Sequence, residues 1–197
     1  MATSYYKNNY GREFTPGQGL PLISTDLDSV RAYQFEIHFV GLPTDITNES
    51  DLTLAAKKIT GLEMASEPIV IDRVNDKVFY PGKVTPGDLV VTFDNLYMRE
   101  TASDLWRYFK HTYDPITGEM TKSSQPGGGA GNTFKAMKAE IVMLDNTMVP
   151  HSTVEVFGVW PTKWAASEFN YTTNDFHTLD VTFKYDFMNA YNYANPT

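Results

Sequence analysis

The side chains that most often perform chemistry in proteins are scattered along this sequence rather than grouped. The chain has no cysteine, which excludes a thiol nucleophile, a disulfide and a thiolate metal site. None of its four histidines is spaced four residues from another, as in a helical metal pair: His38, His111, His151 and His177. We therefore interpret the histidines as solvated or strand-face side chains and expect no metal or other cofactor.

Two further patterns approach known motifs without completing them. The segment QPGGGAGNTF lacks the Lys-Ser/Thr pair of a phosphate loop and precedes no helical pattern, so we expect a glycine-rich loop over about residues 114–133. Carboxylates for acid–base catalysis need not be close in sequence, which leaves a hydrolase as an open alternative. Because Asp180 and Asp186 fall on the outward side of an alternating strand, and no GxSxG motif is present, we predict that the protein is not an enzyme.

Three tryptophans could form a platform for stacking sugars. We expect Trp106 to lie in the core, because it shares a helix face with apolar neighbours. Trp160 precedes Pro161 and is interpreted as a buried anchor at a strand end, whereas the sequence does not assign Trp164. A carbohydrate-binding β-sandwich that uses Trp160 and Trp164 therefore stays an alternative.

The composition favours one sizeable, acidic, β-rich domain. Of the 197 residues, 42% are hydrophobic and 14% aromatic, and aromatic side chains pack well on pleated sheets. The formal net charge of −8 disfavours tight nucleic-acid binding, because that affinity comes mainly from cations that neutralise phosphates. The sequence has no run of 18 apolar residues and no signal-like start. We expect a soluble protein from a reducing cytoplasm.

Alternating apolar residues predict strands, and the clearest run covers residues 178–188. Five large apolar side chains share one face of that run: Leu179, Val181, Phe183, Tyr185 and Phe187. Further strands are expected over residues 31–40, 51–60, 68–74, 76–80, 89–94, 134–144 and 153–159, and one helix over residues 100–113. The pattern predicts a mainly β fold, an antiparallel β-barrel or β-sandwich of about seven strands with one α-helix.

The chain is predicted to contain one main domain with extended additions. Residues 1–30 are polar and rich in Tyr, Gly and Pro, and we expect an extended N-terminal arm. The main domain then covers residues 31–188, with a protruding arm at about 62–86, and residues 189–197 form a C-terminal tail.

A turn near the C-terminus consists of Gly158, Val159, Trp160, Pro161 and Thr162, and a polar loop and an aromatic-rich closing strand follow it. This arrangement resembles the C-terminal region of the tail tube proteins of contractile-tailed bacteriophages. The strand YQFEIHF, the helix TASDLWRYFK and the glycine-rich loop also follow the family's order. The resemblance implies a structural virion protein with a tail-tube-like fold, assembled in the host cytoplasm. A type VI secretion tube protein is a close alternative, and the long N-terminal arm leaves a tube-initiator variant open.

The resemblance also implies partners. These are further copies of the chain in stacked hexameric rings, a tail sheath protein, and baseplate or tube-initiator and tail terminator proteins. DNA would pass through the lumen during ejection without specific binding, which an acidic surface favours because few cations contact phosphates.

From this picture we assign three groups of candidate assembly residues. Apolar contacts between rings are expected from the protruding arm, at Ile69, Ile71, Val78 and Phe79. Contacts of the N-terminal arm with a neighbouring subunit or the sheath are expected at Tyr5, Tyr6 and Phe14. Charged groups of the lumen or of subunit interfaces are expected at Glu36, Glu140, Glu155, Asp180 and Asp186.

Overall fold

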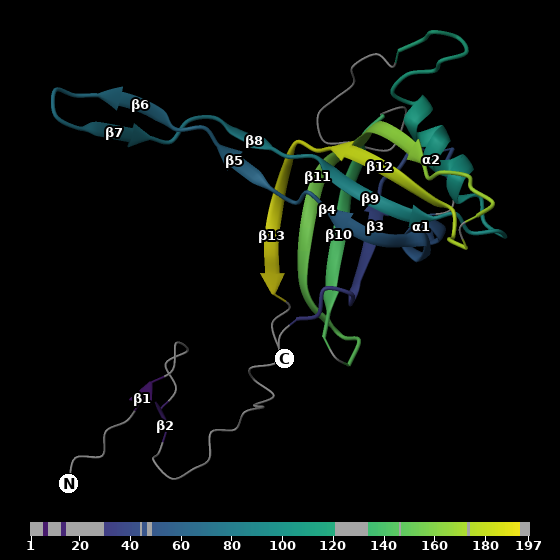
Figure 1. Ribbon diagram of the computed structural model, residues 1–197, viewed down its shortest axis with the longest axis horizontal. Helices are drawn as coiled ribbons and strands as arrows, with labels where there is room; N and C mark the ends of the chain where they lie inside the picture. The colour runs from purple at the N-terminus through teal and green to yellow at the C-terminus, as the bar shows by residue number, and fades with distance from the viewer. Residues whose placement is uncertain are drawn as a thin grey trace.

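The computed structural model describes residues 6–7, 13–14, 30–43, 45–46, 49–120, 134–145, 147–172 and 174–193 (Figure 1). Seven antiparallel strands form its main sheet: β3 (Phe35–Val40), β4 (Ala56–Thr60), β9 (Leu89–Asp94), β10 (Ala136–Leu144), β11 (Pro150–Ala166), β12 (Thr178–Lys184) and β13 (Phe187–Tyr193). The strand order is β3-β10-β11-β12-β9-β4, and β13 pairs with β11. The prediction of a mainly β, antiparallel fold is confirmed.

The 17-residue strand β11 joins the two halves of this sheet. Its first part pairs with β10 and β13, and its second part, from Trp160 onward, pairs with β12. The change of partner follows Gly158, which has a positive φ of 67°, a conformation that glycine adopts at little cost. In Figure 1 the strands β12, β9 and β4 accordingly cross over the layer of β13, β11, β10 and β3.

The hydrophobic core lies between these two layers. Phe39 of β3 contacts Phe93 of β9 and Phe183 of β12, with ring centroids 6.4 Å and 5.6 Å apart. All three rings are fully buried. Burial of each such side chain stabilises the fold by about 1.5–3 kcal/mol, and the alternation over residues 178–188 identifies four core residues: Leu179, Val181, Phe183 and Tyr185.

Two helices cover the end of the layers, where one was predicted. The expected helix is α2 (Thr101–Lys110), which buries Leu105 and Tyr108. Trp106 was wrongly assigned to the core: it is 37% exposed and stacks on Phe109 at 5.7 Å. No helix in the described part of the chain is long and apolar enough to cross a membrane.

The second helix, α1 (Glu49–Ala55), occupies part of a predicted strand. Strand β4 begins only at Ala56, so the prediction of one strand over residues 51–60 was wrong in its first half. The two leucines that suggested alternation do not share a face, since Leu52 is buried and Leu54 is 70% exposed. Helical spacing instead buries Asp51, Leu52 and Ala55 together, and Asp51 forms an ion pair with Arg99 at 2.9 Å.

Two short ribbons extend the chain between β4 and β9. They pair β5 (Met64–Ser66) with β8 (Val84–Pro86) and β6 (Ile69–Asp72) with β7 (Lys77–Tyr80). Figure 1 shows them as one long projection directed away from the domain. A separate pair joins β1 (Tyr6–Lys7) and β2 (Glu13–Phe14).

Two predicted details differ from the structure. The strand order ends at β3 and β4, which do not pair with each other among the described residues, so the sheet is not closed into a barrel. The predicted last strand is interrupted after Lys184, and β13 then pairs with β11 instead of β9 and continues through Tyr193. Phe187 consequently leaves the predicted apolar face, is 52% exposed and stacks on Phe157.

Candidate assembly surfaces

The two-stranded projection, residues 64–86, presents apolar side chains on both of its faces; we call it the arm. In an antiparallel pair, residues opposite each other point to the same face. Ile69 lies opposite Tyr80, and Ile71 opposite Val78. These four side chains, three aliphatic and one aromatic, therefore share one face of the arm. Of the predicted contact residues, only Phe79 is on the other face, opposite Val70.

The arm exposes these side chains to an extent that is unusual for a subunit that acts alone. Phe79 is 65% exposed and Ile69 is 56% exposed, and six further large hydrophobic residues of the arm are also exposed: Met64, Val70, Ile71, Val74, Tyr80 and Val84. Contiguous exposed apolar surface of this kind marks sites of protein–protein contact. The sequence pattern predicted this ribbon. In the structure its apolar side chains do not belong to the hydrophobic core of the domain.

Several hydrogen bonds fix the base of the arm to the core. The Tyr185 hydroxyl donates to the Glu63 carbonyl at 2.6 Å, and Gly87 N–H donates to the same carbonyl at 3.0 Å. Above the base, a Cβ on Gly82 would lie 1.9 Å from the Glu67 carbonyl oxygen. The two strands approach so closely here that only glycine fits. These contacts give the arm a fixed origin on the domain.

A second surface is the outward face of the layer formed by β3, β10, the first part of β11 and β13. Glu140 lies opposite both Glu155 and His38, and Val142 lies opposite Glu36. The structure thus brings together three of the five predicted charged residues, Glu36, Glu140 and Glu155. Facing carboxylates on neighbouring strands repel each other, so this face requires a compensating cation.

Lys138 is that cation. Its ammonium group forms ion pairs with Glu140 and with Glu155, the latter at 2.9 Å, and these hydrogen bonds raise the pKa of Lys138. The ring of His38 lies 3.2 Å from Glu36. Two carboxylates therefore share one lysine, the third lies beside a histidine, and the face stays acidic.

The other two predicted charged residues lie elsewhere. Asp180 is on the outward side of the second layer, where it accepts a hydrogen bond from the Thr92 hydroxyl at 2.6 Å. Asp186 lies between β12 and β13, and both of its carboxylate oxygens accept hydrogen bonds from the Lys135 ammonium, at 2.8 Å and 2.9 Å. The carboxylate of Asp186 is thereby engaged within the subunit.

The turn that carries the sequence resemblance lies at the point where β11 changes partner. Trp160 packs edge-on against Phe134, with ring centroids 5.5 Å apart, and Pro161 is buried. Because Pro161 has no N–H to donate, the ladder is irregular here. The Thr162 hydroxyl donates to the Thr182 carbonyl at 3.1 Å and supplies a bond that the irregular ladder lacks.

Trp160 and Trp164 do not share one surface, and the histidines bring together no metal site in the described part of the chain. Trp160 lies opposite Lys184, whereas Trp164 lies opposite the fully buried Val181, so the two indoles point to opposite sides of the sheet. They do not form one sugar platform. No group of three or more His, Cys, Asp or Glu side chains placed to hold a metal occurs among the described residues.

Some predicted residues lie where little is described. Tyr6 and Phe14 are opposite each other in the β1–β2 pair, of which the structure describes the backbone. Tyr5 and residues 121–133, most of the predicted glycine-rich loop, lie outside the described residues.

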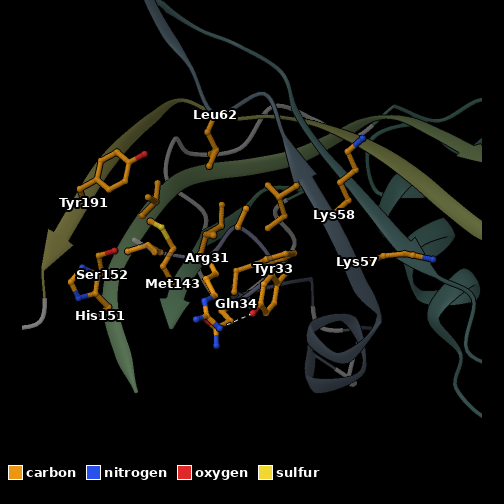
Figure 2. A pocket seen from close by; sticks show the side chains of 16 residues that line it. Arg31, Tyr33, Gln34, Lys57, Lys58, Leu62, Met143, His151, Ser152 and Tyr191 are labelled. Carbon is orange, nitrogen blue, oxygen red and sulfur yellow. Dashed lines mark hydrogen bonds between the residues drawn. The ribbon is translucent and has the colours of Figure 1, made fainter. Parts of the chain in front are cut away.

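A pocket of about 790 Å³, which no sequence pattern predicted, lies between the unpaired edge strands β3 and β4. Figure 2 shows Met143 and Tyr33 inside it, Tyr191 of β13 on one side, and Lys57 and Lys58 of β4 on the other. The whole lining comes from five segments of the chain, residues 30–35, 57–62, 141–143, 151–154 and 191, so no local pattern could have grouped these residues.

Comparisons with known proteins agree with this architecture. A family model described as T4-like virus tail tube protein gp19 matches residues 31–189. The comparison with curated proteins gave no match.

Three solved structures share the fold. The tube terminating cap of the anti-feeding prophage is 12% identical with a TM-score of 0.62, over 85% of this chain and 93% of that one. A chain of the sheath-tube complex of an extracellular contractile injection system is 16% identical, with a TM-score of 0.60, over 85% and 99%. A chain of the anti-feeding prophage baseplate is 16% identical, with a TM-score of 0.61, over 82% and 95%.

The family match covers most of the chain, including both layers, the arm and the β11 turn. The chain therefore belongs to the family of the T4-like virus tail tube protein gp19, and it is a structural, non-enzymatic tail tube protein.

Proposed function

We propose that this subunit closes into six-membered rings that stack into the inner tube of a contractile tail. The observation that carries the proposal is the arm, whose two apolar faces extend beyond the domain that anchors it (Figure 1). With about 3.3 Å per residue, the eleven residues from Met64 to Val74 reach on the order of 30 Å. That length is similar to the diameter of a small domain, so the arm can contact a subunit of the adjacent ring.

The number six comes from related structures and not from this chain. The anti-feeding prophage baseplate that shares the fold is described as 6-fold symmetrised. Free strand edges support ring closure, because β3, β4 and β13 each have one side without a strand partner among the described residues. Pairing or covering such edges between neighbours removes an aggregation hazard.

The acidic face is proposed to line the bore. Glu36, Glu140 and Glu155 would repel a passing polyanion, and the few cations there are already paired. DNA would then slide through the tube without adhering, since affinity for phosphates depends on free cationic contacts. Asp180 and Asp186 are assigned to the outer or interface side of the subunit.

The same architecture supports partners outside the tube. The similar chains come from structures of a sheath-tube complex, a baseplate and a tube terminating cap. We propose that this chain likewise contacts a sheath protein along its length, a baseplate or initiator protein at one end, and a terminator at the other. The N-terminal arm, through Tyr5, Tyr6 and Phe14, is proposed to contact a neighbouring subunit or the sheath.

Removal of the arm tests the proposal. Residues 65 and 83 flank a narrow part of the ribbon, where Glu67 N–H donates to the Lys83 carbonyl at 3.2 Å, so a short glycine linker can replace residues 66–82. We expect the variant to stay folded, because the deleted side chains pack outside the core, and to lose polymerisation. Sedimentation velocity and circular dichroism measure both properties. Unfolding of the variant, or tube formation without the arm, would contradict the proposal.

A further inference from the structure

The pocket between β3 and β4 is the gap where the sheet does not close. Its lining comes from the residues before β3, from β4, and from the adjoining parts of β10, β11 and β13. The floor is formed by apolar side chains, including the core residues Ile141 and Val154 and the partly buried Ile59. An opening of about 790 Å³ therefore reaches the hydrophobic core from the surface.

The rim of this pocket is basic in a chain whose net charge is −8. Arg31, Lys57, Lys58 and His151 line it, and Figure 2 shows His151 on one side, the two lysines on the other, and Arg31 between them. Lys57 forms an ion pair with Asp94 at 3.2 Å. Lys58 has no ion pair among the described residues. An apolar floor with a basic rim suits an occupant that combines apolar side chains with carboxylates.

The chain contains such a segment directly beside the pocket. Val30 lines the pocket, and the ten residues before it read LPLISTDLDS, with four apolar side chains, two aspartates and no basic residue: Leu20, Leu22, Ile23, Leu27, Asp26 and Asp28. We infer that residues 20–29 dock into the pocket of their own subunit and cover the gap between β3 and β4.

Covalent connection favours the chain's own segment over a separate molecule. The segment begins one residue from the pocket and can extend about 3.3 Å per residue, which spans the opening several times over. A short tether gives the segment an effective concentration of the order of millimolar.

Thiol labelling tests the inference, because the chain has no native cysteine. Leu62→Cys places a thiol in the pocket lining, and Leu54→Cys places one on α1 outside it. In monomeric full-length protein we expect a maleimide to label L62C at least tenfold more slowly than L54C. Adding Leu22→Asp and Ile23→Asp should speed the labelling of L62C about tenfold and leave L54C unchanged. An unchanged L62C rate would overturn the inference, as would protection of L62C that appears only in assembled tubes, since a second copy would then cover the pocket.

Disulfide formation gives a second readout that does not depend on folding of the aspartate variants. The pair Leu22→Cys and Tyr191→Cys should oxidise within one chain, whereas the pair Leu22→Cys and Tyr97→Cys should not. Tyr97 is a matched exposed tyrosine in the β9–α2 loop, outside the pocket. A crosslink between two chains would give the pocket to a neighbour's segment and overturn the inference. Labelling of the monomer and disulfide formation within one chain do not depend on tube formation, so failure of ring stacking is a separate result.

Discussion

Gly158 and Asp186 are in direct contact at the point where β11 changes from one layer to the other. Gly158 has φ of 67°, and a Cβ built on it would lie 2.2 Å from Asp186 Oδ2. The same carboxylate binds the Lys135 ammonium, and Asp186 N–H donates to the Phe157 carbonyl at 2.9 Å. The absence of a side chain at Gly158 therefore leaves room for the Asp186 carboxylate, which pairs with Lys135 at the break between β12 and β13.

The substitution Gly158→Ala is expected to lower the free energy of unfolding by about 2–4 kcal/mol, because it combines backbone strain with displacement of a paired carboxylate. Gly118→Ala is the matched control: Gly118 has φ of 74° and no heavy atom near the added Cβ. The control should lose only the conformational part, about 1–2 kcal/mol. Urea denaturation measures both, and equal losses would contradict the role of the Asp186 contact.

Tyr108 joins helix α2 to two strands of the core. Its hydroxyl donates to the Val159 carbonyl at 2.6 Å and accepts from Ala136 N–H at 3.1 Å, with the side chain 1% exposed. Tyr108→Phe leaves two buried backbone groups without this partner and should cost about 1–3 kcal/mol. Tyr97→Phe, at an almost fully exposed site, should change stability by less than about 0.5 kcal/mol. Similar effects of the two changes in thermal unfolding would be evidence against this bridging role.

Asp104 gives stability a defined pH dependence. Burial raises the pKa of its carboxyl above the ordinary value of 3.8, and Arg107 opposes that rise, whereas Glu100 and Asp51 add to it. Because the pKa of Asp104 is higher in the folded state than in the unfolded state, its protonated carboxyl contributes to stability. That contribution is complete below the unfolded-state pKa and is lost as the pH rises through the folded-state pKa. The stability of Asp104→Asn relative to the native chain should therefore increase from pH 3 to pH 7.

Chemical denaturation of both proteins across this pH range measures the difference between their free energies of unfolding. Other groups that titrate alike in both proteins cancel in that difference. A difference that is constant, or that decreases toward pH 7, would show that Asp104 is not the group responsible.

Because the acidic face is proposed to line the bore, reversing the charge of one of its residues should make the tube retain DNA more strongly. Glu36 is exposed on β3, so Glu36→Lys should fold normally and add one cation per subunit to the proposed bore. We expect assembled E36K tubes to retain a fluorescent oligonucleotide at least about tenfold more strongly than native tubes at low salt, with a steeper salt dependence. Glu168→Lys, in the exposed β11–β12 loop, is the control. Equal retention by both variants would place Glu36 outside the bore.

Local patterns predicted those parts of the fold in which burial alternates along one element. The strand β12 was found because Leu179, Val181 and Phe183 are all buried on one face. The same alternation continued past Asp186 in the sequence, although the chain there leaves β9 and joins β11. Nothing local distinguishes Phe187 from its predecessors, because its exposure depends on a partner strand more than 20 residues away.

Sites formed between distant segments could not be predicted. The acidic residues were predicted one by one, and only the register of β10 and β11 shows that Glu140 faces Glu155. Asp186 is instead bound by Lys135, which lies 51 residues away in the sequence. The pocket depends on β3 and β4 ending the strand order without meeting. By contrast, the arm was predicted because its turns and short β runs are local features.

Electron cryomicroscopy of the purified full-length protein tests the central claim most directly. We expect hollow tubes of stacked six-membered rings. One face of each arm should pack against a subunit of the adjacent ring, through Ile69, Ile71, Val78 and Tyr80, and Glu36, Glu140 and Glu155 should face the bore. Particles that stay monomeric at high concentration, or tubes in which the arm contacts no other ring, would contradict it.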